Sequence, residues 1–97
     1  MSLTDLLHTG KGNAISGRVL AEALGLRDIR TLTQMIETER RSGAPICASV
    51  TPPVGYYIAA DAEELRRYLH SLQRRKGEIG RTLEALENIL EIWEAAP

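Results

Sequence analysis

The side chains with the most recognisable chemistry lie between residues 18 and 38. An arginine can donate two hydrogen bonds to a guanine edge, a glutamine can pair bidentately with adenine, and threonines can reach phosphates or thymine methyl groups. The candidates for such contacts are Arg18, Arg27, Arg30, Thr31, Thr33, Gln34 and Thr38. Taken singly, each is an ordinary residue of a solvated helix, so its interpretation depends on the elements that position it.

Residue types that support catalysis or metal binding do not occur at productive spacings. His8, Cys47 and His70 are far apart and match no metal-ligand spacing. The run 10–13 has a lysine between glycines, but it lacks the spacing of a phosphate-binding loop and follows no predicted strand. No nucleophile with an adjacent base can be proposed. We therefore expect no enzymatic activity, no cofactor, no metal and no small-molecule substrate.

The apolar pattern and the turn residues predict two helices joined by a tight turn. Ser16 can cap a helix that Gly25 ends, and Asp28 can cap a second helix that runs to about Ser42. A short helix over residues 2–8 precedes them, with leucines on one side. This order of helix, turn and helix is typical of a helix-turn-helix unit.

The pattern then changes from helix to strand and back to helix. Residues 45–50 and 56–59 are rich in β-branched and aromatic side chains and flank a proline-containing turn, which predicts a β-hairpin. Asp61 then opens a long helix. The sequence therefore predicts an α+β fold, mostly α, with a domain over residues 1–60 and a helical extension over residues 61–97.

A series of landmarks between residues 15 and 58 has the order and spacing of a known fold. They are Leu20-Ala21, Leu24-Gly25-Leu26, Leu32, Ile36, Arg40, Gly43, Pro45, Ile46 and Gly55-Tyr56-Tyr57-Ile58. In these residues the chain resembles the winged helix-turn-helix family, notably the N-terminal type of biotin-operon repressors and small phage-encoded proteins. The chain departs from the family at Glu39, where a leucine is common, and in a recognition helix one residue longer before Leu32.

The resemblance implies a three-helix core with a β-hairpin wing, and a recognition helix at about residues 28–42 in the DNA major groove. On that placement Arg30 and Gln34 face base edges, while Arg18 and Arg27 near the turn suit phosphates. The predicted wing tip, residues 49–54, has no arginine or lysine. We therefore expect the DNA base sequence to be recognised by the recognition helix and not by the wing.

Charge gives weaker support for a nucleic-acid partner. The net charge is −1, from 12 basic and 13 acidic residues. Residues 61–76 carry five basic side chains, which either contact phosphates or form a solvated helix face, and the acidic excess lies in residues 77–97. Two alternatives therefore stay open: a winged-helix protein–protein interaction module, such as a phage accessory or inhibitor protein, and a non-specific DNA-binding accessory of replication or packaging.

An apolar stripe follows the long helix in steps of four and three over four heptads. We expect Leu65, Leu69 and Leu72 to pack on the domain, and the distal residues to pair two copies of the chain; these are Ile79, Leu83, Leu86, Leu90 and Trp93. Gly77 and Gly80 leave open the alternative that the helix bends or breaks near residues 76–80 into an antiparallel helical pair instead of one rod. A second alternative to pairing between copies is that the last helix folds back and covers the core of its own domain.

These patterns together predict a small double-stranded DNA-binding regulator, encoded by a (pro)phage or a bacterium and acting as a homodimer. No apolar run is long enough to cross a membrane, and the N-terminus lacks the features of a secretory signal. The single cysteine has no internal disulfide partner. We therefore expect a cytoplasmic location and no membrane partner.

Overall fold

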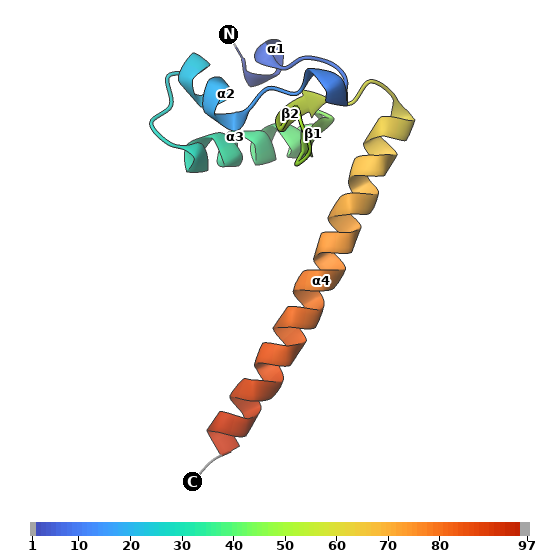
Figure 1. The fold of residues 1–97 in the computed structure, drawn as a ribbon. Helices are drawn as coiled ribbons and strands as arrows, with labels where there is room; N and C mark the ends of the chain where they lie inside the picture. The colour runs from blue at the N-terminus through green and yellow to red at the C-terminus, as the bar shows by residue number, and fades with distance from the viewer. Residues whose placement is uncertain (1, 96–97) are drawn as a thin grey trace.

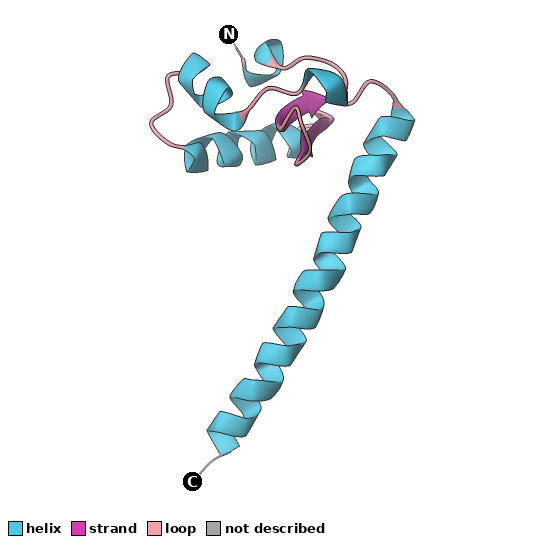
Figure 2. Ribbon diagram, in the orientation of Figure 1, coloured by secondary structure: helices cyan, strands magenta, loops and turns pink. Residues whose placement is uncertain are grey.

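The computed structural model describes residues 2–95, which form an α+β fold that is mostly helical (Figures 1 and 2). The described part contains a two-stranded antiparallel hairpin and a long C-terminal helix, and both predicted features are therefore confirmed. The elements in chain order are α1 (Leu3–Leu6), the 3-10 turn η1 (Lys11–Asn13), α2 (Gly17–Ala23), α3 (Ile29–Arg41), β1 (Ile46–Ser49), β2 (Gly55–Ile58) and α4 (Ala62–Ala95).

Helices α2 and α3 begin where their N-cap side chains satisfy free backbone N–H groups. The Ser16 hydroxyl accepts from the Val19 N–H at 3.2 Å, and the Asp28 carboxylate accepts from the Thr31 N–H at 2.8 Å. The Thr31 hydrogen bond lowers the pKa of the Asp28 carboxyl. Between the helices, Gly25 has a φ of +69°, which suits the turn that ends α2. Both predicted helix starts are confirmed.

The hairpin is held to the helices by a third extended segment. β1 and β2 pair in an antiparallel register that places Ser49 opposite Gly55. The Ile15 N–H donates to the Tyr56 carbonyl at 2.9 Å, and the Tyr56 N–H donates to the Ile15 carbonyl at 2.8 Å. Gly55 has a φ of +147°, and a Cβ atom there would collide with the Ile15 carbonyl. Glycine is therefore required where this segment crosses the start of β2.

The hydrophobic core lies among the three short helices and the first strand. Its buried members are Leu3, Leu7, Leu20, Ala21, Leu32, Ile36 and Ile46. Leu32 and Ile36 are buried as predicted, with exposed fractions of 0% and 1%. A smaller cluster of Cys47, Tyr57 and Tyr68 attaches the first turns of α4 to the hairpin. The chain therefore closes its core within about the first 68 residues.

Arg40 connects three elements at the end of α3. Its Nε donates to the Ile46 carbonyl of β1 at 2.8 Å, and a terminal nitrogen donates to the Tyr68 hydroxyl of α4 at 3.0 Å. The other terminal nitrogen lies 2.9 Å from the Glu37 carboxylate. The guanidinium carbon also lies 5.5 Å from the centre of the Tyr68 ring, within reach of a cation–π interaction. Arg40 thus links the end of α3 to both β1 and the start of α4.

The start of α4 has the reciprocal hydrogen bonds of a capped helix. The Asp61 carboxylate accepts from the Glu64 N–H at 2.8 Å, and the Glu64 carboxylate accepts from the Ala60 N–H at 3.0 Å. The helix then runs to Ala95 through Gly77 and Gly80 without interruption. The predicted alternative of a helical pair within this segment is therefore wrong. Each glycine costs only about 1 kcal/mol against alanine, which does not outweigh the hydrogen bonds on either side.

The distal half of α4 extends away from the domain (Figure 1). The described chain measures 59 × 33 × 27 Å, and its radius of gyration is 17.5 Å, against about 13 Å for a compact domain of this length. The alternative in which the last helix covers its own core is therefore wrong. The expected packing of the proximal stripe holds only for Leu65, because Leu69 and Leu72 remain 46% and 36% exposed.

Candidate nucleic-acid interface

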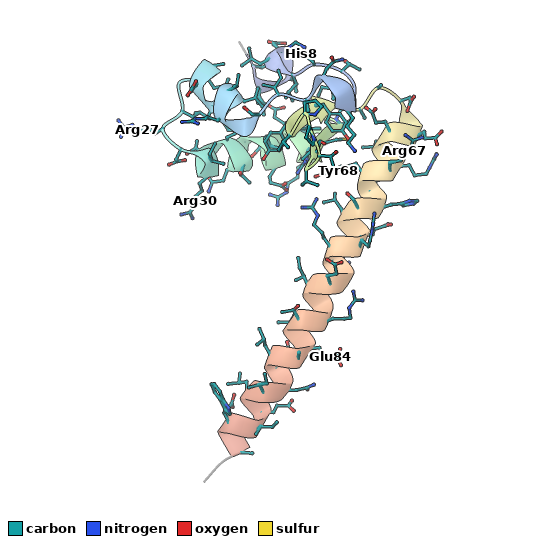
Figure 3. The ribbon with its side chains drawn as sticks, viewed as in Figure 1. His8, Arg27, Arg30, Arg67, Tyr68 and Glu84 are labelled. Atoms are coloured by element: carbon teal, nitrogen blue, oxygen red, sulfur yellow. The ribbon has the colours of Figure 1, made fainter. Side chains whose placement is uncertain are left out.

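The outward face of α3 consists of the side chains opposite its buried Leu32 and Ile36. At about 100° per residue, the residues centred on that face are Arg30, Gln34, Thr38 and Arg41, all exposed. Arg30 and Arg41 are eleven positions apart, which spans about 16 Å along the helix. Figure 3 shows Arg30 pointing away from the domain. The structure thus places Arg30, Gln34 and Thr38, three of the seven predicted contact residues, on one exposed face of α3.

Sequence reasoning missed Arg41, although the signal was present. Arg41 follows Gln34 by seven residues, so it returns to the same side of the helix. In the described part of the chain, no hydrogen bond or ion pair uses the side-chain nitrogens of Arg30, Gln34 or Arg41. Glu37 is the acidic residue nearest this face, and its carboxylate is engaged by Arg40 at 2.9 Å. These polar groups are therefore available to a partner molecule.

The hydroxyl groups of the three predicted threonines, Thr31, Thr33 and Thr38, differ in their hydrogen bonds. The Thr33 hydroxyl donates to the Ile29 carbonyl at 3.1 Å, and the Thr38 hydroxyl donates to the Gln34 carbonyl at 3.0 Å. In this arrangement neither hydroxyl can donate to a phosphate, so each offers only an acceptor and a methyl group. Thr31 lies in the first turn of α3, where its side chain is exposed.

Arg18 and Arg27 lie beside the turn that joins α2 to α3. Both line a shallow hollow of about 240 Å³ whose wall also includes Glu22. The Arg18 Nε is 3.9 Å from the Glu22 carboxylate, and both side chains are largely exposed, so this ion pair is weak. Arg27 points outward from the turn in Figure 3. The structure thus places these two cations together, beside the N-terminal end of α3.

The hairpin tip, residues 50–54, is neutral and apolar where it is most exposed. Val50 is 85% exposed and Val54 is 56% exposed. A cleft of about 280 Å³ separates the tip from α4, and its charged lining residues are Lys11, Glu64, Arg67 and Arg74. Arg74 and Arg75 also border Val50 on the neighbouring side of the tip. The cations nearest the tip therefore come from η1 and α4 and not from the hairpin.

The five residues predicted to pair two copies all lie on the exposed distal half of α4. Their exposed fractions range from 52% to 73%, and they are Ile79, Leu83, Leu86, Leu90 and Trp93. Ile79, Leu83 and Leu86 line a shallow apolar hollow together with Glu78 and Thr82. The exposure of these side chains leaves their apolar stripe uncovered in the described chain.

Two buried titratable groups, Cys47 and Tyr57, have raised pKa values that favour their neutral forms. Burial raises the pKa of the Cys47 thiol, and burial beside that thiol raises the pKa of Tyr57 to about 12. Within residues 2–95, no group of His, Cys, Asp or Glu side chains is arranged to hold a metal ion. None of the described helices is long and apolar enough to cross a membrane.

Comparison with known proteins found no matching family model, no matching curated protein and no matching solved structure. The assignment of a function therefore rests on the exposed groups of α3, their charges and the elements that hold them.

Proposed function

We propose that this protein binds double-stranded DNA by inserting the outward face of α3 into the major groove. The observation that carries the proposal is the exposure of Arg30, Gln34 and Arg41 on one face of a helix whose other face is anchored in the core. A helix with its side chains is about 10–12 Å across, which fits a major groove about 12 Å wide.

The arrangement of elements supports a winged helix-turn-helix as the finer description of the fold. α2 packs against α3 across the Gly25 turn, and β1 and β2 follow directly. The two hydrogen bonds between Ile15 and Tyr56 form an isolated antiparallel bridge beside β2, in the segment between α1 and α2, where a winged helix has its first strand. On this description α3 is the recognition helix and residues 50–54 are the tip of the wing.

The groups on and near α3 divide by what they recognise. Arg30 can donate in bidentate fashion to guanine, and Gln34 can pair with adenine, so these two carry sequence choice. Arg18, Arg27 and Arg41 supply phosphate contacts, which contribute affinity without sequence choice. The neutral wing tip contributes little, and Arg74 and Arg75 beside it extend the phosphate-binding surface.

The protein we propose is a small cytoplasmic regulator of (pro)phage or bacterial origin that acts as a homodimer through α4. A second candidate function, a protein–protein interaction module, is favoured by the net charge of −1 and the apolar wing tip. The two functions predict opposite results with naked DNA. A non-specific DNA-binding accessory would bind DNA but would not discriminate between sequences.

The test is fluorescence anisotropy at low salt on a panel of labelled duplexes that differ in sequence, with the full chain. We expect the unaltered protein to bind, and the Arg30→Ala plus Gln34→Ala variant to bind at least about tenfold more weakly to its best sequence. The matched control is Gln73→Ala plus Arg81→Ala, which removes the same two side-chain types from α4. Absence of binding by the unaltered protein rejects DNA as the partner and favours the interaction module. Equal weakening on every sequence favours the non-specific accessory.

A further inference from the structure

The uncovered apolar stripe of distal α4 continues along the helix toward the domain, as far as Leu69. Its members follow one another in steps of three and four, and they are Leu69, Leu72, Lys76, Ile79, Leu83, Leu86, Leu90 and Trp93. We call this set the seam. All its members are exposed in the single chain, along about 36 Å of helix at about 1.5 Å per residue. A repeat of this kind is typical of a helix that packs against another helix.

The charges of α4 are separated along its length. Residues 66–76 carry five basic side chains and no acidic one, whereas residues 77–95 carry five glutamates and one arginine. If two copies paired in parallel, basic would lie beside basic and acidic beside acidic. If they paired antiparallel, each basic half would lie beside the acidic half of the other copy. The charge pattern therefore favours a second copy in the antiparallel orientation.

One antiparallel register matches the whole seam to itself. A two-fold axis beside residue 81 sets Ile79 against Leu83, Lys76 against Leu86, Leu72 against Leu90 and Leu69 against Trp93 of the second copy. Each layer then joins the two kinds of seam position, as an antiparallel coiled coil requires. The same axis places Gly80 beside its own copy at the flank of the seam, where two small residues allow a close approach.

Lys76 is the seam residue whose neighbours differ most between the parallel and the antiparallel orientation. In a parallel pair it would face the Lys76 of the second copy within the seam, which places two like charges together. In the antiparallel register it lies beside Leu86, with Glu87 of the second copy next to it. Arg66 and Glu94 of the second copy then flank the seam at its ends. The seam thus gains opposite charges in one orientation and repulsion in the other.

The groove beside the domain provides a place for the end of the second copy. It has a volume of about 310 Å³, and its walls include Pro45 and Ile46 of the domain and Leu65, Leu69 and Leu72 of α4. The register above brings Trp93 of the second copy to Leu69, in the wall of this groove. Trp93 is 73% exposed in the single chain and is the only tryptophan in the sequence. An indole ring is large enough to cover the exposed leucines of the groove.

We propose that two copies of this chain pair through antiparallel α4 helices, with Trp93 of each copy docked in the groove between the domain and α4 of the other. The inference rests on the pairing role proposed for α4 and is independent of DNA binding. In this dimer the α4 helix of each copy covers the distal stripe of the other, and Trp93 of each copy occupies the groove of the other. The two domains then lie at opposite ends of the paired helices.

Cross-linking tests the orientation in the full chain. A short bis-maleimide is added to Leu72→Cys, to Leu90→Cys and to an equimolar mixture of the two. Antiparallel pairing predicts a cross-linked dimer in the mixture only, because each residue is about 27 Å along the axis from its own copy. Parallel pairing predicts cross-links in each variant alone and overturns the proposal. The unaltered protein is the control, since Cys47 is fully buried.

Tryptophan emission tests the groove, and sedimentation gives the mass of each sample. We expect emission from the unaltered dimer to be blue-shifted, and to shift to the red in Pro45→Asp, which alters the groove but leaves the seam intact. The matched control, Ala23→Asp, introduces the same charge on an exposed position of α2 and leaves the emission unchanged. A monomeric unaltered protein refutes pairing itself. If the protein is a dimer and Pro45→Asp leaves the wavelength of its tryptophan emission unchanged, the docking of Trp93 is refuted.

Discussion

The domain of residues 2–60 and the distal half of α4 use the same aliphatic side chains in opposite ways. In the domain, Leu20, Leu32 and Ile36 are at most 1% exposed. On distal α4, Leu83 and Leu90 are 55% and 52% exposed at positions just as regular in their spacing. The contrast shows that a helical apolar stripe predicts burial, but does not identify the surface that buries it.

The difference follows from geometry and chain connection. Short helices joined by tight turns can bring their apolar faces together within one chain, as α2 and α3 do across Gly25. A straight helix of 34 residues is about 50 Å long and outreaches any domain of this size. The domain therefore buries its apolar faces within one copy, whereas the stripe of distal α4 stays exposed in the single chain and, on the proposal above, is covered by a second copy.

The largest expected effect separates the two regions by stability. Leu32→Ala should lower the free energy of unfolding by about 3 kcal/mol, because it removes a fully buried side chain and leaves a cavity. Leu83→Ala should leave the unfolding of the domain unchanged when it is measured at a concentration where the chain is monomeric. Urea denaturation followed by tyrosine fluorescence and circular dichroism measures both. Equal losses would contradict the division into a closed domain and an open helix.

A smaller set of changes should abolish pairing and spare the domain. Leu83→Asp plus Leu86→Asp places charges in the seam. We expect the dissociation constant of the dimer to rise at least about a hundredfold, which corresponds to about 2.7 kcal/mol. Analytical ultracentrifugation measures the change. The control, Glu84→Ala plus Glu91→Ala, alters charges that lie off the seam and should keep the dimer. If the unaltered protein is already a monomer at high concentration, the proposed dimer is wrong.

The smallest expected effect concerns the glycines of α4. Gly77→Ala should stabilise the helix by about 1 kcal/mol, since alanine is the better helix former and the space around this position is open except for the end of Arg81. The dimer should therefore melt at a higher temperature in circular dichroism. Gly12→Ala is the control outside α4, in open space in the domain. A lower melting temperature for Gly77→Ala would indicate that the glycine is needed in the assembly.

Local features of the fold were predictable because their causes are local. Ser16 and Asp28 cap the helices that they precede, and Gly25 ends the first of them. The residues on the outward face of α3 also followed from periodicity, and Arg41 was overlooked although the same period contains it. Whether that face binds DNA stays a prediction, because no related protein of known function matches the chain.

Features that depend on distant contacts were not predictable. The hydrogen bonds of Arg40 to Ile46 and Tyr68 join residues up to 28 positions apart, and nothing in the local pattern indicates them. The exposure of Leu69 and Leu72 likewise follows from the angle at which α4 leaves the domain. The two glycines indicated a break in α4 that did not occur, because the cost of glycine is small beside the continuity of a long helix.

The most direct test of DNA binding by α3 is selection from a library of randomised duplexes at about 50 mM salt with the full chain. We expect the unaltered protein to enrich a common site that contains guanine, and Arg30→Ala to lose the preference at one guanine position while still retaining DNA. Retention of no duplex by the unaltered protein would contradict the account. Enrichment of the same site by Arg30→Ala would contradict the role of α3.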